Sequence, residues 1–192
     1  APAMRAAGPY RAEIDALYDS LLDALGASGR TPFVMVGAAA SGSGASMLTL
    51  SLAHAACNRG RAVLIVDRCE RAPTLTHFAE DFEPAILRRS GAAARVLRKD
   101  GDGAIVLQTL DDEARRDAAA WDDDVFDFVL IDAGQFRAAA RVAREIGSLD
   151  AMVAVARSGA DVAQVEEELD RLDLSDLCVA LAFTAARGRN LR

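Results

Sequence analysis

Short apolar runs alternate with helical patterns along most of the chain, and this alternation is the feature that most constrains its fold. The predicted strands are Phe33–Val36, Ala62–Val66, Ala104–Leu107, Asp127–Ile131, Ala151–Ala156 and Leu177–Phe183. The predicted helices are Tyr10–Leu25, Met47–Asn58, Ala85–Arg98, Asp111–Trp121, Arg137–Ile146 and Ala160–Leu172. Strands that are apolar throughout are buried on both faces, which is typical of parallel strands joined by helical crossovers. The sequence therefore predicts an α/β fold with a mostly parallel central sheet and helices on both faces, in three layers.

Length and composition narrow the class of protein. At 192 residues the chain is expected to form a single domain over residues 1–192, with residues 1–29 as a leading helix and linker. The hydrophobic fraction is 52%, but no run approaches the ~18 consecutive apolar residues of a spanning helix. We therefore expect no direct membrane insertion by this segment. The net charge of −7 argues against nucleic acid as a partner, because phosphate contacts depend on a surplus of Lys and Arg.

The cysteines and histidines predict neither a disulfide framework nor a transition-metal centre. Cys57, Cys69 and Cys178 are odd in number and widely spaced, which fits a reducing compartment. His54 and His77 do not form a cluster with the spacing of metal ligands.

A loop of small residues, Gly37–Ser46, follows the first predicted strand and leads into a predicted helix. Successive backbone N–H groups at a helix N-terminus bind phosphate, and the small residues Gly42 to Gly44 suit such a cradle. In open parallel sheets, ligands lie beyond the carboxyl ends of the strands. We expect the loop to converge there with Asp67 and Asp132, which follow two further predicted strands.

Several interpretations of this loop remain open. A dinucleotide-binding fingerprint is weak, because Met47 stands where the third glycine is needed. A P-loop has Gly-Lys-Ser or Gly-Lys-Thr at the helix start, whereas Gly44-Ala45-Ser46 lacks the lysine, and the only lysine of the chain is Lys99. In a purely structural alternative, Asp67 and Asp132 cap the helices that follow them and the glycines only permit a tight turn.

Three blocks in order nevertheless resemble one family. Val34–Val36 followed by Ser41–Ser46 resembles a strand with its P-loop, Arg61–Leu75 resembles a Walker A′ segment, and Phe126–Asp132 resembles a Walker B segment. Over roughly residues 10–185 the chain resembles the bacterial tyrosine-kinase (BY-kinase) branch of the ParA/MinD-type P-loop proteins. The resemblance implies a P-loop NTPase-like fold. It also implies the cytoplasmic domain of a polysaccharide co-polymerase, at the inner face of the inner membrane.

The resemblance also assigns a site. The implied nucleotide-binding residues are Ser41, Gly42, Ser43, Gly44, Ala45, Ser46 and Met47. The implied Mg²⁺ ligands are Ser46, Asp67 and Asp132, and the two aspartates are candidate relics of catalytic residues. Ala45 replaces the P-loop lysine and Ala40 the variant lysine of the group. Losing one such transition-state contact costs ~10²- to 10³-fold in rate, so we expect little or no kinase or ATPase activity. The expected ligand, where one is retained, is ATP or ADP with Mg²⁺.

The resemblance leads to a functional hypothesis with two alternatives. The hypothesis is a catalytically degenerate domain that acts as a structural or regulatory component of exopolysaccharide or capsule export and of chain-length control. Its expected partner is a membrane-spanning co-polymerase subunit or its own upstream membrane segment, with self-association as a further expectation. The family's Glu-x-x-Arg-x-x-Arg assembly motif is represented only by Glu13, Ala16 and Asp19, without either arginine. The alternatives are an active ATP-dependent protein tyrosine kinase with an atypical P-loop and a ParA/MinD-type positioning protein.

Overall fold

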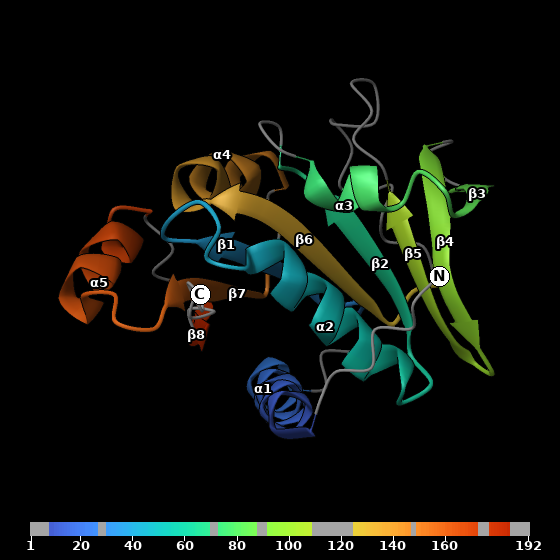
Figure 1. Ribbon diagram of the computed structural model, residues 1–192, viewed down its shortest axis with the longest axis horizontal. Coiled ribbons are helices and arrows are strands. Elements are labelled where there is room, and N and C mark those ends of the chain that lie inside the picture. Colours follow the sequence, from blue (N-terminus) through green and yellow to red (C-terminus); the bar gives the residue numbers. More distant parts are fainter. Residues whose placement is uncertain are drawn as a thin grey trace, which may run out of the picture.

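A computed structural model describes residues 8–26, 30–69, 73–87, 92–108, 125–146, 149–172 and 177–184 (Figure 1). The helices are α1 Gly8–Leu25, α2 Ala45–Cys57, α3 Thr74–Phe78, α4 Phe136–Ile146 and α5 Val162–Asp170. The strands are β1 Phe33–Ala38, β2 Ala62–Asp67, β3 Glu83–Ile86, β4 Ala93–Asp100, β5 Gly103–Gln108, β6 Phe128–Gln135, β7 Ala151–Arg157 and β8 Cys178–Thr184.

The strands form one sheet in the order β3-β4-β5-β2-β6-β1-β7-β8. The run from β5 to β8 is parallel throughout, while β3 and β4 add an antiparallel pair at one edge. The β6 strand lies between β1 and β2, so the carboxyl ends of these three strands meet at the middle of one sheet edge. The predicted α/β fold with a mostly parallel sheet is confirmed.

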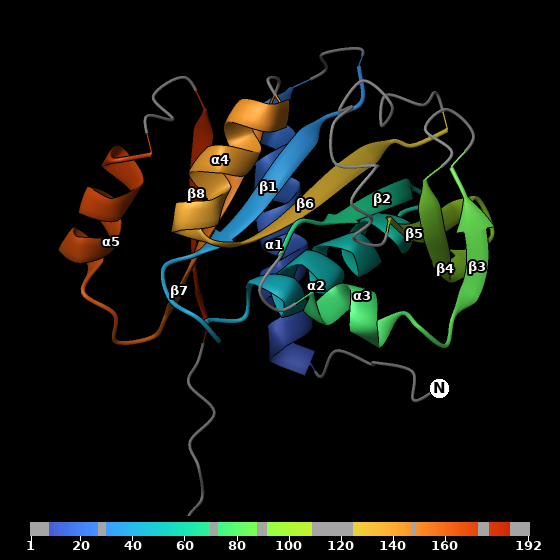
Figure 2. The same ribbon diagram turned by 90° about the horizontal axis from the view of Figure 1, so that it is seen from above.

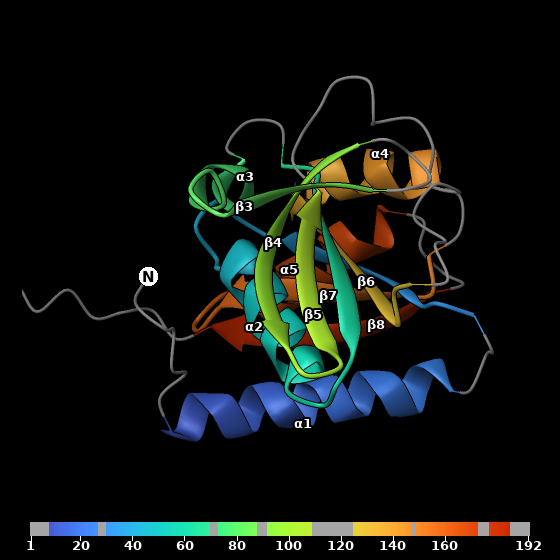
Figure 3. The ribbon, with the colours of Figure 1, turned by 90° about the vertical axis from the view of Figure 1, so that its right-hand side faces the viewer.

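Helices cover both faces of the sheet, and alternate residues of each strand enter two separate cores. Val34 and Val36 of β1 lie in the core beneath α1, α2 and α3, whereas Phe33 and Met35 lie in the core on the side of α4 and α5. Figures 2 and 3 show α4 on the opposite side of the sheet from α1 and α2. Both faces of the central strands are therefore buried, which explains their continuous apolar sequences. Among the helices of the described residues, none is both long and apolar enough to cross a membrane.

The predicted helix Ala85–Arg98 is wrong. Its described parts belong to β3 and β4, and β4 continues to Asp100 and turns into β5 with Asp100 opposite Gly103. The Ala, Leu and Arg residues of this segment have high helix propensity, but propensity is a small effect and pairing with β5 overrides it. The signal that was available is the Gly101-Asp102 pair, which forms the two-residue hairpin turn between Asp100 and Gly103 and in which Gly101 takes a positive φ of 57°.

The remaining predicted elements agree with the structure to within a few residues at their ends. The α2 helix begins at Ala45, before the predicted Met47, because Gly44 takes a left-handed φ of 96° and sets the first turn there. The α5 helix begins at Val162, two residues later than predicted, since Asp161 caps it by accepting a hydrogen bond from the amide of Ala163. The predicted helix Asp111–Trp121 lies outside the described residues, and the single domain over residues 1–192 stays a prediction.

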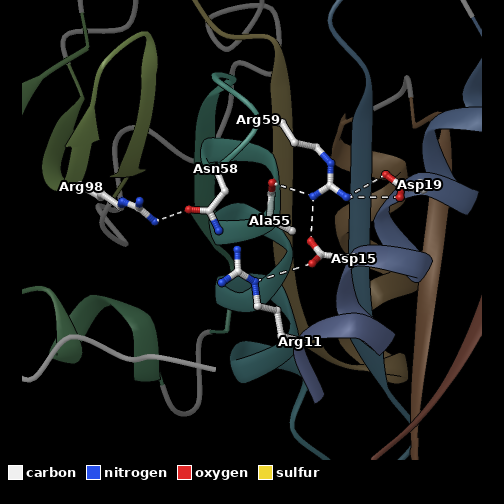
Figure 4. Close-up of polar contacts among 7 residues, drawn as sticks. All are labelled: Arg11, Asp15, Asp19, Ala55, Asn58, Arg59 and Arg98. Carbon is white, nitrogen blue, oxygen red and sulfur yellow. Dashed lines mark hydrogen bonds and ion pairs between the residues drawn. The ribbon is translucent and has the colours of Figure 1, made fainter. Parts of the chain in front are cut away.

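The leading helix α1 packs against its own domain. Ile14, Tyr18 and Leu21 are buried beneath it, and the Tyr18 ring lies 5.9 Å from that of Phe128 in β6. Arg59, which follows α2, pairs with two acids of α1, as Figure 4 shows. Its guanidinium donates to Asp15 at 2.8 Å and to Asp19 at 3.0 Å, and it lies 4.9 Å from the centre of the Tyr18 ring. The face of α1 that carries Tyr18 is thus used within the chain.

We expect Arg59→Gln to lower the free energy of unfolding by about 1 kcal/mol, because it removes two ion pairs and a cation–π contact that share one side chain. The matched control is Arg11→Gln, which removes one exposed pair with Asp15 on α1 itself and should change stability by less than about 0.5 kcal/mol. Urea unfolding at low and high salt measures both effects. Equal losses in the two variants would show that Arg59 does not anchor α1.

Candidate functional site

The loop between β1 and α2 forms an open cradle of backbone amides. Gly42 and Gly44 take positive φ values of 72° and 96°, which favour glycine. The amide of Leu48 donates to the carbonyl of Gly44 at 2.9 Å, and no side chain of the described residues caps the start of α2. The amides of the first turn therefore keep the partial positive charge of a helix N-terminus, which attracts anions.

The sequence-predicted loop residues come together at this end of α2. Ser41, Gly42 and Met47 are exposed, Gly44 and Ser46 are half-buried, and Ser43 and Ala45 are buried. The Ser43 hydroxyl oxygen is buried without a hydrogen-bond partner among the described residues. A buried hydroxyl without a partner in the wall of a phosphate-type loop is a group that a bound ligand would satisfy.

Asp132 lies next to this loop in the centre of the sheet. It pairs in register with Val36 of β1 and with Asp67 of β2, and its side chain is fully buried. One carboxylate oxygen, Oδ1, accepts from the amide of Gly134 at 3.1 Å, whereas Oδ2 has no partner within the described part of the chain. Burial raises the pKa of Asp132 to about 6, against the opposing effects of the Ser46 hydroxyl and the Gly134 amide, which favour the charged form.

Asp67 has a different environment although it is equally buried. Its Oδ1 accepts from the amide of Cys69 at 3.0 Å, and its Oδ2 accepts from both the amide and the hydroxyl of Thr76 at 2.9 Å. These bonds tie α3 to the end of β2. The structure thus gives Asp67 a contact of the capping type, which the sequence left open. Asp132, by contrast, keeps one oxygen without a partner among the described residues.

The loop, Ser46 and the two acids fit a nucleotide with a magnesium ion only in part. The backbone amides of residues 41–47 would hold phosphate, except that of Ser43, which already donates to the Ala40 carbonyl at 3.2 Å. The Ser46 hydroxyl and Asp132 would supply oxygen ligands, which Mg²⁺ prefers. Asp67 already accepts three hydrogen bonds from Cys69 and Thr76, which leaves it little capacity for a metal. The described residues contain no group of three or more His, Cys, Asp or Glu side chains placed to hold a metal alone. A magnesium ion here would therefore depend on phosphate oxygens as well.

Two residues of the site were missed by the sequence analysis. Arg157 at the end of β7 donates through Nη2 to the carbonyls of Ser41 and Gly42 at 3.3 and 3.2 Å. Thr184 at the end of β8 donates to the carbonyl of Ser43 at 2.6 Å. Each is a polar residue directly after a predicted apolar strand, which is the same signal that singled out Asp67 and Asp132.

Comparison with known proteins supports the fold. No family model matches the sequence, and no curated protein matches it. Among solved structures, the kinase domain of the Escherichia coli tyrosine kinase ETK is similar with a TM-score of 0.63 and 20% identity, covering 95% of this chain and 79% of that one. The BceF tyrosine kinase domain gives a TM-score of 0.62 and 16% identity, covering 95% and 80%.

A nucleotide-binding protein from Archaeoglobus fulgidus, solved in complex with ADP, is similar with a TM-score of 0.59 and 18% identity, covering 86% of this chain and 68% of that one. The likeness to tyrosine-kinase domains extends over nearly the whole chain. The chain therefore has the P-loop NTPase-like α/β fold of these domains, and the resemblance seen in the sequence is confirmed at the level of the fold.

The raised pKa of Asp132 predicts a pH dependence of stability. An acid whose pKa rises from 3.8 to about 6 on folding binds its proton more tightly in the folded state. The free energy of unfolding should therefore fall as the pH rises from about 4 to about 6, by at most about 3 kcal/mol. Asp132→Asn should lack this component. Urea unfolding across this pH range compares it with Asp102→Asn, which removes an exposed acid from a turn. Parallel pH profiles for wild type and Asp132→Asn would contradict the assignment.

Proposed function

We propose that this domain binds a nucleotide at the loop of residues 41–47, transfers phosphate poorly or not at all, and acts as a regulatory module in polysaccharide export. One observation carries the proposal. The amide cradle at the start of α2 lies beside a buried carboxylate with a free oxygen, while Ala45 occupies the place where the resemblance has the P-loop lysine.

Support for nucleotide binding comes from the groups that lack partners. The Ser43 hydroxyl and Oδ2 of Asp132 are buried and unbonded within the described residues, and burying a polar group without a hydrogen bond is costly. Both belong to the segments that the resemblance assigns to a nucleotide. A structurally similar protein of the same fold was solved with ADP.

Support for weak or absent catalysis comes from the charges. Phosphoryl transfer depends on cations that meet the charge developing on the transferred group. No Lys or Arg occurs between Gly37 and Asn58. Asp67, the second implied metal ligand, is bonded to Thr76 and Cys69. The groups that bind the anion are thus present, but the groups that stabilise transfer are missing or engaged elsewhere.

The role in export rests on the resemblance together with the likeness to tyrosine-kinase domains. In this proposal the domain lies at the inner face of the inner membrane. It pairs there with a membrane-spanning co-polymerase subunit or with a membrane segment of its own protein. Nucleotide binding would then change this contact, and through it the length of the exported polysaccharide, without phosphate transfer.

Calorimetric titration with ADP and ATP, with and without Mg²⁺, tests the nucleotide part. We expect the wild-type domain to bind both nucleotides, and Ala45→Lys to bind ATP about tenfold more tightly, since it adds a charge-assisted contact at the start of α2. Ala16→Lys, at an exposed position of α1, adds the same charge elsewhere and should leave the affinity unchanged. A wild-type domain that binds neither nucleotide would overturn this part of the proposal. Mg-ATP-dependent phosphorylation of a tyrosine peptide by the wild type would favour the active-kinase alternative.

Deleting this domain in the source cell tests the export part. We expect the length distribution of the surface polysaccharide to change, and the wild-type domain to restore it. Asp67→Asn and Asp132→Asn together should fail to restore it, because they remove the two carboxylates beside the proposed nucleotide site, provided that the doubly substituted domain is folded. Gel analysis of the polysaccharide gives the answer. An unchanged length distribution after deletion would contradict a role in chain-length control.

A further inference from the structure

Arg157 is a cation that touches the loop from outside it. The residue is exposed at the carboxyl end of β7, and one of its nitrogens, Nη2, donates to the carbonyls of Ser41 and Gly42. A β-carbon at Gly42 would lie 2.8 Å from the same nitrogen, so a larger residue there would displace the guanidinium. The glycine therefore serves the approach of Arg157 as well as the turn of the loop.

The charge of Arg157 is not neutralised by the part of the chain that is described. Neither Nε nor Nη1 has a hydrogen bond to any described residue, and no carboxylate there lies within ion-pair distance. Many other arginines of the described segments pair with a carboxylate: Arg11, Arg30, Arg59, Arg61, Arg68, Arg98, Arg141 and Arg171. In a chain with a net charge of −7, a cation without an ion pair beside an amide cradle is well placed for an anion.

The backbone of Arg157 is fixed relative to the loop. Arg157 pairs in register with Thr184 of β8, and the Thr184 carbonyl accepts from the amide of Ser158 at 2.8 Å. Thr184 in turn donates to the carbonyl of Ser43, so the strand ends of β7 and β8 hold the loop together from one side. The Arg157 side chain is therefore attached to a rigid strand end. A side chain anchored there loses little conformational freedom when it binds a ligand.

We propose that Arg157 is the cationic contact for the phosphates of the bound nucleotide, provided from β7 because the loop itself has no cation. This inference rests on the proposed nucleotide binding. While Nη2 keeps its bonds to the loop, Nε and Nη1 remain free to donate, and a guanidinium suits phosphate oxygens because its N–H groups form a planar fork. The guanidinium of Arg157 lies at the first half of the loop, beside Ser41 and Gly42, and not at Ala45. It therefore strengthens binding without restoring the charge at the start of α2.

The test compares the binding of ADP, ATP and adenosine, each with Mg²⁺, to the folded wild-type domain and to three variants. Arg157→Gln keeps an amide donor but removes the charge, and we expect it to weaken ADP and ATP binding by about tenfold or more while changing adenosine binding little. Arg157→Lys keeps the charge without the fork and should give an intermediate loss. The matched control is Arg144→Gln on α4, and it should bind like wild type. Within the described segments, the Arg144 guanidinium bonds only the carbonyl of Ala140 in the same helix.

The outcomes separate this inference from the proposal on which it rests. If the wild type binds ADP and Arg157→Gln binds it as tightly as Arg144→Gln does, Arg157 is not the phosphate contact, and nucleotide binding stands. If Arg157→Gln loses adenosine and ADP binding by the same factor, the residue only shapes the loop, and the inference fails. If the wild type binds no nucleotide at all, the proposed binding fails and this inference fails with it.

Discussion

The parallel pairing of β6 with β1 on one side and with β2 on the other determines where the polar groups of this chain lie. In this register Asp132 faces Val36 and Asp67, so both acids reach the end of the sheet beside the loop. A slip of one residue in β6 would turn Asp132 into the core on the α4 side and move Phe128 and Leu130 out of their own core. The apolar packing of β6 therefore fixes the site, and the site cannot shift without loss of the core.

The same register places two carboxylates side by side in a region that water does not reach. Burial of a carboxylate is tolerated when hydrogen bonds compensate it, and the two acids differ in this respect. Asp67 accepts three hydrogen bonds, from Cys69 and Thr76, and holds α3 in place. Asp132 accepts one from Gly134 and keeps an oxygen without a partner in the described segments, which is why burial raises its pKa. One acid thus supports the structure, and the other is left with capacity for a ligand.

The sequence predicted the parallel part of the fold well because each buried strand there is a continuous apolar run with a polar residue at its end. It failed at β3 and β4, where the residues are partly exposed and their helix-favouring composition is overridden by pairing with β5. It identified Asp67 and Asp132 but not their different roles, because those depend on Thr76 and Gly134, which only the folded chain brings to them. Arg157 was missed for the same reason, since it meets the loop across more than a hundred residues of sequence.

In the proposed site, the cation is Arg157 at the end of β7 and not a lysine of the loop. This difference changes what the site can do with a bound anion. A lysine at the start of the helix meets the charge that develops as phosphate is transferred, and that contact lowers the barrier because it strengthens in the transition state. An arginine whose guanidinium also bonds the Ser41 and Gly42 carbonyls is held at the first half of the loop. Its contact with the proposed ligand would be similar before and during transfer, and uniform binding of this kind raises affinity without raising the rate. In the proposed function, this arrangement of charges therefore favours nucleotide binding over phosphate transfer.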